Sequence, residues 1–350
     1  MFLLQALRIL KDALFSPSLP LKTRFHLLLL QPITLITYTI EWAISRKFPH
    51  SSEVTIPLKR SPGSVRAVIY PPSKPKPQKP LHLNIHGGAF LGGLPEGNAR
   101  FCTELAENTG AVVVSTAYRY APVHVFPDAH EDVQDVTDFL VQNAEELWDA
   151  DPKNLTVSGF SAGGNLALAV AQGLQSKSEY TVKGLALFEG VVDFRLPPWL
   201  KPKPPDFPKT DPLFFLQQLF DAYAGPNRLR DMDNPLLHPT LADIHTLPQN
   251  MLFTIAGVDI LREETVTMAK RLDAEARRIN RSRGLPEMPV QPDGKAIVVR
   301  ASVFEGQIHG WTCMPSFAID VGKRKKAYGD AVGFLCDVHR AYGFTCTEAD

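Results

Sequence analysis

The stretch Leu155–Val170, LTVSGFSAGGNLALAV, decides the fold. Its first residues, Leu155–Gly159, are typical of a buried strand, and an apolar helical run begins at Gly164. The turn between them reads Gly159-Phe160-Ser161-Ala162-Gly163, the G-x-S-x-G pattern of a nucleophile elbow. Small residues on both sides of Ser161 allow a sharp turn, so we expect its Oγ to project above the sheet. The Ala162 N–H is then expected to face an oxygen that gains negative charge during acyl transfer.

Two further strands are predicted to supply the groups that such a serine needs. A serine hydroxyl is a poor nucleophile at neutral pH, so it requires a base, and the base requires an acid that fixes its tautomer. Strand Met251–Ala256 leads into Asp259, and strand Val298–Phe304 leads into the loop that contains His309. The chain order serine, aspartate, histidine differs from both common serine-protease orders. We therefore predict Ser161 as nucleophile, His309 as base and Asp259 as acid.

Other residues compete for these roles. Of the ten histidines, only His309 combines a strand end, a flanking glycine and the right place in the chain order. For the acid, Glu263 and Glu305 remain rivals of Asp259. Glu263 is expected in the first turn of a helix, where the helix dipole favours a carboxylate without any catalytic role.

A second glycine-containing loop, His86-Gly87-Gly88-Ala89-Phe90, directly follows the predicted strand Leu81–Ile85. Glycines let the backbone approach a ligand closely, so the N–H groups of Gly87 and Gly88 are predicted to complete an oxyanion hole with Ala162. His86 is expected to support this loop rather than to act as base. A simple Gly-Gly turn is the alternative interpretation.

From Glu53 onward, short β-rich runs alternate with helical stretches, which is typical of α/β proteins. The first two strands flank the turn Ser61-Pro62-Gly63 and are expected to be antiparallel, and the rest to form a mostly parallel sheet with helices on both faces. The predicted strands are Val54–Leu58, Val65–Tyr70, Leu81–His86, Ala111–Ala117, Leu155–Gly159, Gly184–Phe188, Met251–Ala256 and Val298–Phe304. The predicted helices are Asn98–Glu107, Ala129–Ala144, Gly164–Gln172, Glu263–Arg277 and Arg324–Tyr342.

The alternation is interrupted at residues 193–245, a proline-rich stretch that is predicted to form a cap or lid above the sheet. The apolar N-terminal residues 1–52 are predicted to form helices of the same cap, and residues 53–350 the α/β domain. Open α/β sheets bind ligands at the carboxyl ends of their strands, beneath such a cap. Four phenylalanines in the insertion favour an apolar substrate, with ordinary core packing as the alternative: Phe207, Phe214, Phe215 and Phe220.

The N-terminus lacks the basic region and cleavage site of a signal peptide, and Met1–Phe15 is predicted to be an amphipathic helix. Residues Leu27–Ile44 are about long enough to span a bilayer but contain Gln31, Pro32 and Glu41. Burial against the protein is therefore favoured, with a peripheral membrane helix and a true span as alternatives. The expected location is cytoplasmic, with membrane association left open.

Charge and cysteine content exclude several classes of function. The chain of 350 residues has 37 basic and 37 acidic side chains, so no nucleic-acid partner is indicated. The cysteines, Cys102, Cys313, Cys336 and Cys346, lack the spacing of a zinc site or a disulfide scaffold, so buried free thiols are expected. No metal or other cofactor is predicted. The basic run Lys323–Lys326 is interpreted as the solvated face of the last helix, with a nuclear address as the alternative.

Four motifs in order identify a family resemblance: HGGAF from His86, GFSAGGN from Gly159, GVDILREE from Gly257 and IHGW from Ile308. From about Leu81 to the C-terminus the chain resembles the hormone-sensitive-lipase-like α/β hydrolases, in particular the arylacetamide-deacetylase-like carboxylesterases. Three positions depart from the family pattern: Ala89 stands for the third glycine of HGGG, Phe160 for the common aspartate before the nucleophile, and Ile260 for the proline of D-P-L.

The resemblance implies an α/β-hydrolase fold with a helical cap and a cofactor-free serine carboxylesterase that acts on a small to medium apolar ester. Amides, lactones and thioesters can be cleaved by the same triad, so a non-ester acyl hydrolase remains an alternative. So does a catalytically silent ligand-binding or cyclase member of the fold. The interpretation as a membrane-bound lipase or deacetylase is supported only by the apolar N-terminus. The sequence does not indicate an oligomeric state.

Overall fold

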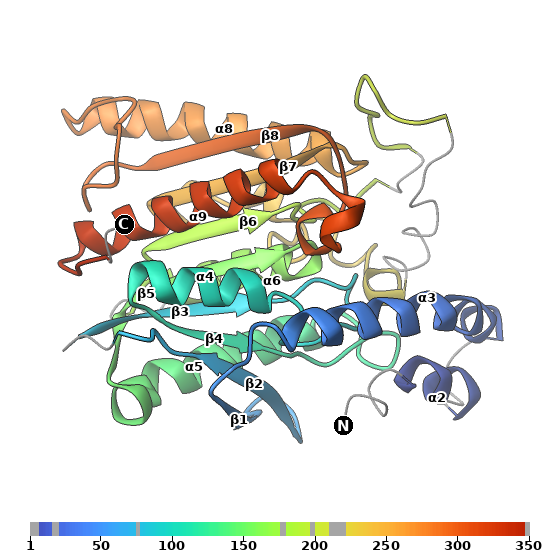
Figure 1. Cartoon of the computed structure of the whole chain (residues 1–350). Helices are drawn as coiled ribbons and strands as arrows, with labels where there is room; N and C mark the ends of the chain where they lie inside the picture. The colour runs from blue at the N-terminus through green and yellow to red at the C-terminus, as the bar shows by residue number, and fades with distance from the viewer. Residues whose placement is uncertain are drawn as a thin grey trace.

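The computed structural model describes residues 7–15, 21–74, 78–175, 180–196, 200–209 and 222–346. Its centre is an eight-stranded sheet in the order β1-β2-β4-β3-β5-β6-β7-β8 (Figure 1). β2 pairs antiparallel with β1 and β4, and all other pairs are parallel, which confirms the predicted fold class. The strands are β1 Ser52–Pro57, β2 Ser64–Tyr70, β3 Lys79–Ile85, β4 Val112–Thr116, β5 Ala150–Phe160, β6 Gly184–Phe188, β7 Asn250–Val258 and β8 Val298–Ile308.

Helices cover both faces of the sheet, as the continuous apolar strands require. Helices α4 (Ala99–Thr109) and α9 (Val321–Ala341) pack on one face. Helices α5 (Asp128–Trp148), α6 (Ala162–Gln175) and α8 (Arg262–Ser282) pack on the other. Each of the five contains a predicted helix, extended or shifted by a few residues. Within the described ranges, short 3₁₀ helices are η2 Pro239–Leu241, η3 Ile244–Thr246, η4 Trp311–Cys313 and η5 Ser316–Ala318.

Strands β7 and β8 run further than predicted. Their pairing continues to the partners Val258 and Ile308, past an irregularity between Ala256 and Val258. As a result, Asp259 and His309 each directly follow the last residue of a strand at the carboxyl edge of the sheet. The predicted strands end too early because Gly257 interrupts the apolar run of β7, and Glu305-Gly306-Gln307 interrupts that of β8.

A buried polar layer lies within the sheet on the side of α9. The His82 ring contacts Thr156 Oγ1 and Ser158 Oγ, both at 2.8 Å. Ser158 donates to Asn84 Oδ1 at 2.9 Å, and Thr156 Oγ1 lies 3.1 Å from the ring of His339. All five side chains are buried. Most of their polar atoms are paired within the layer, which is the condition for polar groups to be tolerated in a core, whereas His339 Nδ1 has no hydrogen-bond partner among the described residues.

Two predictions that concern the C-terminal region are wrong in part. Cys336 and Cys346 form a disulfide with Cα atoms 5.9 Å apart, whereas Cys102 and Cys313 are free. The pairing arises because the chain turns back after α9, at Gly343 with φ 93°, and spacing alone does not reveal such a turn. Within Lys323–Lys326, Arg324 is buried rather than solvated: it donates to Met314 O and Ser316 Oγ, both at 2.8 Å.

The N-terminal helices α2 (Arg8–Phe15) and α3 (Leu21–Ser45) extend beyond the carboxyl edge of the sheet (Figure 1). Both contact the loop that follows β3. The Arg8 guanidinium donates to Leu91 O, and Tyr38 Oη accepts from Gly93 N at 2.8 Å. Leu27 and Tyr38 are buried. Among the described residues, no helix meets the length and apolarity that a membrane span requires.

The described part of the predicted insertion also begins at the carboxyl edge. The buried Lys201 ammonium pairs with Glu264 in the first turn of α8 and donates to Asp193 O at 2.7 Å. Glu264 in turn accepts from Val192 N at 3.1 Å. These bonds fix the start of the insertion on the α/β domain. Residues 210–221 lie outside the described part of the chain, so the division into domain and cap stays a prediction.

Candidate active site

The turn at Ser161 has the backbone of a nucleophile elbow. Ser161 has φ 52°, a left-handed conformation that a non-glycine residue seldom adopts. Its N–H donates to Phe188 O at 2.8 Å, and its carbonyl accepts from Gly164 N at 2.9 Å. A Cβ on Gly163 would clash with the carbonyl groups of Ile85 and His86. Glycine at this position therefore lets the start of α6 pack directly against the end of β3.

The three predicted catalytic side chains form one chain of hydrogen bonds. His309 Nε2 lies 2.8 Å from Ser161 Oγ, and His309 Nδ1 lies 2.7 Å from Asp259 Oδ2. The other carboxylate oxygen of Asp259 accepts from Leu261 N at 3.0 Å. Asp259 is 2% exposed, so its charge is directed at the imidazole with little screening by solvent. The arrangement suits proton transfer from Ser161 to His309.

The electrostatics of His309 combine two opposed effects. Burial lowers its pKa, because it disfavours the charged imidazolium. The charge of Asp259 and the hydrogen bond to it act in the opposite direction, with a further contribution from Glu189. The attraction outweighs the burial and raises the pKa of His309 to about 9.

The loop after β3 lies against the elbow. A Cβ on Gly87 would lie 3.3 Å from Ser161 Cβ and 3.0 Å from Phe160 O, so a side chain here would crowd the nucleophile. Gly88 has φ 114°, which favours glycine. Gly87 and Gly88 are thus next to Ser161, and Ala162 follows it in the chain. The donation of their N–H groups to an oxyanion remains a prediction.

His86 lies within this loop and away from the serine's proton. Its Nδ1 lies 2.6 Å from Gly87 O, and its Nε2 lies 3.1 Å from Tyr120 Oη. The ring also stacks on Tyr118 at 4.7 Å, and Tyr118 donates to His86 O at 3.2 Å. Burial lowers the pKa of His86 to about 4, which keeps the ring neutral. These contacts agree with the predicted supporting role.

The rivals for the acid are engaged elsewhere. Glu263 pairs with Arg262 at 3.0 Å, and the largely exposed Glu305 pairs with the same arginine at 3.2 Å. Neither occupies the position that Asp259 takes beside His309.

The departures from the family pattern have local explanations. Phe160 stacks on Phe188 at 4.3 Å and packs in the core beneath α4 and α9, so it contributes to packing rather than to the site. Ala89 and Phe90 both have positive φ, 54° and 64°. The buried Phe90 ring stacks on Tyr223 at 4.0 Å. Ile260 is buried beside Asp259.

One acidic residue near the triad was missed by sequence reasoning. Glu189 directly follows β6, is 4% exposed, and accepts a hydrogen bond from Gly310 N, next to His309. The sequence contained one sign of it: an acidic residue directly follows the apolar strand GLALF. That position lies at the carboxyl edge of the sheet, where α/β proteins bind their ligands.

Two cavities lined by described residues can be placed relative to the triad. The larger, about 420 Å³, lies at the amino ends of β6, β7 and β8, the edge opposite the triad, where it is lined by Lys183, Gln249 and Ile297. The smaller, about 180 Å³, is lined by Asp193, Ile260 and Glu264 and lies beside the loop that carries Asp259. Because the smaller cavity lies next to the loop of Asp259, it is the better candidate for a part of the substrate site. Phe207 packs at the edge of the main core, and Phe214, Phe215 and Phe220 lie outside the described residues.

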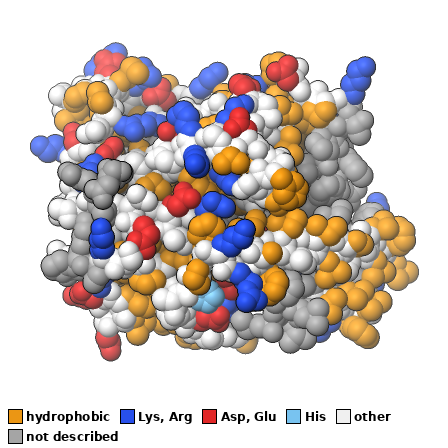
Figure 2. All heavy atoms as spheres, viewed as in Figure 1, with side chains coloured by type: hydrophobic (Ala, Val, Ile, Leu, Met, Phe, Trp, Pro, Cys, Tyr) orange, Lys and Arg blue, Asp and Glu red, His pale blue; other side chains and the backbone are white. Residues whose placement is uncertain are grey.

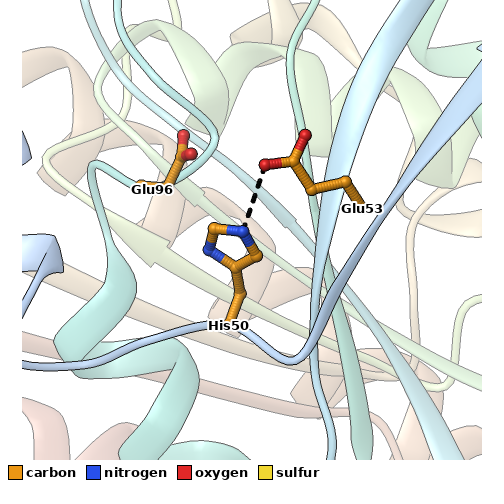
Figure 3. A group of neighbouring side chains, drawn as sticks. All are labelled: His50, Glu53 and Glu96. Carbon is orange, nitrogen blue, oxygen red and sulfur yellow. Dashed lines mark hydrogen bonds and ion pairs between the residues drawn. The ribbon is translucent and has the colours of Figure 1, made fainter.

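A group of possible metal ligands, His50, Glu53 and Glu96, lies at the β1–β2 edge of the sheet (Figure 3). His50 Nε2 lies 3.2 Å from Glu53 Oε1. The Arg66 guanidinium donates to Glu53 at 2.7 Å and to Glu96 at 3.0 Å. Both carboxylates therefore already have a cationic partner, and the group is explained as an ion-pair cluster.

The sheet is mostly parallel, and Ser161, Asp259 and His309 are in contact at the ends of three of its strands. These features define the class of α/β proteins built around a nucleophile elbow. The chain belongs to the α/β-hydrolase fold family: the profile described as alpha/beta hydrolase fold matches residues 82–288, more than half of the chain. Its relatives place it among the hormone-sensitive-lipase-like members, as the motifs indicated.

Known proteins of this family are similar over different lengths. Arylacetamide deacetylase of Oryctolagus cuniculus is 40% identical over 119 residues, 33% of this chain and 30% of the relative. Ethyl acetate hydrolase of Pseudomonas putida is 29% identical over 197 residues, 55% of this chain and 59% of the relative. The chain thus matches less than two thirds of the length of these relatives. An esterase structure from Pyrobaculum calidifontis, 26% identical, has a TM-score of 0.67 and covers 93% of this chain and 95% of its own.

Proposed function

We propose that this chain is a serine carboxylesterase that hydrolyses a small to medium apolar carboxylic ester through an acyl-enzyme. The observation that carries the proposal is the continuous hydrogen-bonded chain from Ser161 through His309 to Asp259. The names of the relatives, an ethyl acetate hydrolase and an esterase among them, support the same reaction class.

The reaction proceeds in two half-reactions on the same groups. His309 Nε2 takes the Ser161 proton while Oγ attacks the substrate carbonyl carbon, and the carbonyl oxygen becomes an oxyanion. The N–H groups of Gly87, Gly88 and Ala162 stabilise that oxyanion, a contribution of about 3 to 4 kcal/mol for each donor. His309 then returns the proton to the leaving alcohol. In the second half-reaction His309 takes a proton from water as the water oxygen attacks the acyl carbon. The bond to Ser161 Oγ then breaks, and His309 returns the proton to Oγ.

The test is the variant Ser161→Ala, which removes only the attacking oxygen. We expect it to fold normally and to lower the turnover of p-nitrophenyl butyrate by about 10⁴-fold or more. Ser282→Ala changes an exposed serine at the far end of α8 and is the matched control with unchanged turnover. Retention of activity by Ser161→Ala, or no reaction of the wild-type protein with a fluorophosphonate probe, would refute the proposal.

Amide hydrolysis is the second candidate, because one relative is named arylacetamide deacetylase. A panel of p-nitrophenyl esters of increasing chain length, measured beside an arylacetamide and a lactone, separates the two candidates. We expect kcat/KM to be highest for an ester. A higher value for the amide would make this chain an amidase.

We further infer that the N-terminal helices lie on an anionic lipid surface. Helices α2 and α3 expose large apolar side chains, which Figure 2 shows as an apolar area at the lower right of the molecule. They are Leu14, Phe15, Leu21, Phe25, Leu28, Leu29, Ile36 and Trp42. Residues 1–50 carry six basic and two acidic side chains. Both acidic ones, Asp12 and Glu41, are engaged with the protein, so the exposed charge of these helices is positive.

Flotation with vesicles of phosphatidylserine and phosphatidylcholine tests this contact. We expect the full chain to float with these vesicles and the double variant Phe15→Ser, Phe25→Ser to bind at least about 10-fold more weakly. Val290→Ser removes an exposed apolar side chain in the loop before β8 and should change nothing. Absence of flotation, or equal flotation of the double variant, would exclude a lipid contact through these helices.

A further inference from the structure

The molecule holds a buried carboxyl group that the mechanism above does not use. Glu189 is placed rigidly: its N–H donates to Thr254 O at 2.8 Å, and its φ is 53°. The residue before it, Phe188, accepts the hydrogen bond from Ser161 N. Glu189 therefore has its backbone tied both to β7 and to the nucleophile elbow.

The side chain of Glu189 is directed at the loop that carries the catalytic histidine. Its Oε2 accepts from Gly310 N, and the backbone N–H of Thr312 favours the charged carboxylate electrostatically. Its other oxygen, Oε1, is buried and has no hydrogen-bond partner among the described residues. The hydrogen bond that this side chain makes with the described residues thus goes to the N–H group directly after His309.

The opposite side of the same loop is held by α9. Tyr328 donates to Thr312 O at 2.9 Å, and Arg324 donates to Met314 O at 2.8 Å. The loop from Gly310 to Met314 is therefore fixed between Glu189 on one side and two side chains of α9 on the other. Gly310 itself has φ 75°, so the chain turns sharply at the first of these contacts.

A bond from a backbone N–H to a carboxylate in a buried site is stronger than one between neutral groups. Removal of the carboxylate would leave the Gly310 N–H group unpaired and release the loop on that side. Because His309 directly precedes Gly310, a shift of the loop moves the imidazole relative to both Ser161 Oγ and Asp259. Displacements of about 1 Å at such a base cost about 100-fold in rate.

Resting on the proposed function, we propose that Glu189 is a positioning residue for His309. It fixes the loop so that the imidazole bridges Asp259 and Ser161, and its negative charge stabilises the imidazolium that forms when Ser161 loses its proton. It touches neither substrate nor nucleophile in this role.

The charged and titratable groups around Glu189 come from several elements. His309 and Asp259 act on it from the ends of β8 and β7, and Cys313 and Tyr328 respond to it from η4 and α9. Burial raises the pKa of Glu189 to about 7, against the attraction of His309. The charged carboxylate form of Glu189 therefore predominates above neutral pH, which is the pH range in which His309 must be neutral to act as base.

Two substitutions separate the hydrogen bonds from the charge. Glu189→Ala removes both, and we expect kcat for p-nitrophenyl butyrate to fall about 10- to 100-fold with KM within about twofold. Glu189→Gln keeps a carbonyl acceptor, so kcat should recover to within about fivefold of wild type. The lost attraction lowers the pKa of His309, so the acid limb of the kcat profile should move to lower pH in Glu189→Gln.

The control is Asp135, a buried carboxylate on α5 that accepts from the N–H groups of Lys59 and Arg60 at 2.8 and 2.9 Å. Asp135→Ala should lower the stability but leave kcat and the pH profile unchanged. If Glu189→Ala behaves in the same way, Glu189 has only a structural role and the proposal is overturned. Equal kcat values and equal pH profiles for wild type and both Glu189 variants would overturn it as well.

The low-field proton resonance of the His309–Asp259 hydrogen bond gives a readout that does not depend on turnover. We expect it to shift or broaden in Glu189→Ala and to be nearly restored in Glu189→Gln. An unchanged resonance in Glu189→Ala contradicts the positioning role even if the chain proves not to be an esterase. Failure of the esterase proposal itself would appear separately, as a wild-type protein that does not react with the fluorophosphonate.

Discussion

The side chains of Ser161, Asp259 and His309 lie far apart in sequence but are in contact in the structure. The contact of His309 with Asp259 determines the pH range in which His309 can accept the serine proton. The imidazole accepts the serine proton only when it is neutral. Burial opposes the positive charge on His309, yet the neighbouring carboxylate overrides it and raises the pKa of His309 to about 9. The protonated, inactive form is therefore favoured at neutral pH in the free protein.

We expect kcat/KM to rise from pH 7 and to level off above about pH 9, since that is where His309 loses its proton. Initial rates followed by pH-stat titration of a simple ester measure this directly. Asp259→Asn should lower kcat by about 10³- to 10⁴-fold and move the remaining acid limb to lower pH, because the attraction for the imidazolium is gone. A profile that is already flat from pH 6 in the wild type would contradict the assignment.

At the scale of elements, helix α3 acts on the loop that contains Gly87 and Gly88. Tyr38 Oη accepts from Gly93 N, whose Cα is so crowded by His86 that only glycine fits there. The contact connects the N-terminal helices to the predicted oxyanion loop. Stability of that loop therefore depends in part on Tyr38, a residue of helix α3.

Tyr38→Phe removes the acceptor and leaves the buried Gly93 N–H unpaired. We expect a loss of about 1 to 3 kcal/mol in the free energy of unfolding, measured by urea titration. Thr39→Ala is the neighbouring control, because Thr39 is exposed and bonds only locally to Leu35 O. Equal stability of both variants would show that the N-terminal helices do not support the loop.

Much of this arrangement could be predicted from the sequence, because the deciding signals are local. Apolar runs placed the eight strands within a few residues, and small residues around Ser161 marked the elbow. Asp259 and His309 were found through their positions after strands. By contrast, the Cys336–Cys346 pairing and the burial of Arg324 depend on how α9 packs and where the chain turns back. Glu189 was missed because its partner, Gly310 N, is remote in sequence and is a backbone group.

At the scale of the whole molecule, four buried histidines couple stability to pH. Burial lowers the pKa of each: His86 and His130 to about 4, His339 to about 3, and His82 well below its usual value. In the unfolded chain they take up protons near pH 6.5. Protons therefore favour unfolding below that pH, and the stability that these residues contribute is lost as pH falls from about 6.5 toward 4.

Three groups whose pKa is raised in the folded chain lower the stability as pH rises. Burial raises the pKa of Glu189 to about 7 and that of Glu41 to about 8, so the folded chain holds protons that the unfolded chain releases above pH 4.5. Their contribution, with that of His309, declines as pH rises. Below pH 6.5 the four histidines outnumber Glu189 and Glu41, and above it these two carboxyl groups and His309 dominate, so we expect the urea midpoint to be highest near pH 6.5. A midpoint that rises steadily from pH 5 to pH 8.5 would contradict this balance.

The two ends of the described chain lie at opposite edges of the sheet. Helix α2 lies beyond the carboxyl ends of the strands (Figure 1), whereas Tyr342, just after α9, lies 3.4 Å from Gln249 at the amino end of β7. A purification tag or surface tether attached after Tyr342 would therefore start from the amino edge of the sheet, while one fused ahead of α2 would start from the carboxyl edge, where Ser161 lies. Protein immobilised through its C-terminal end should accordingly keep its turnover, and protein immobilised through its N-terminal end should lose part of it.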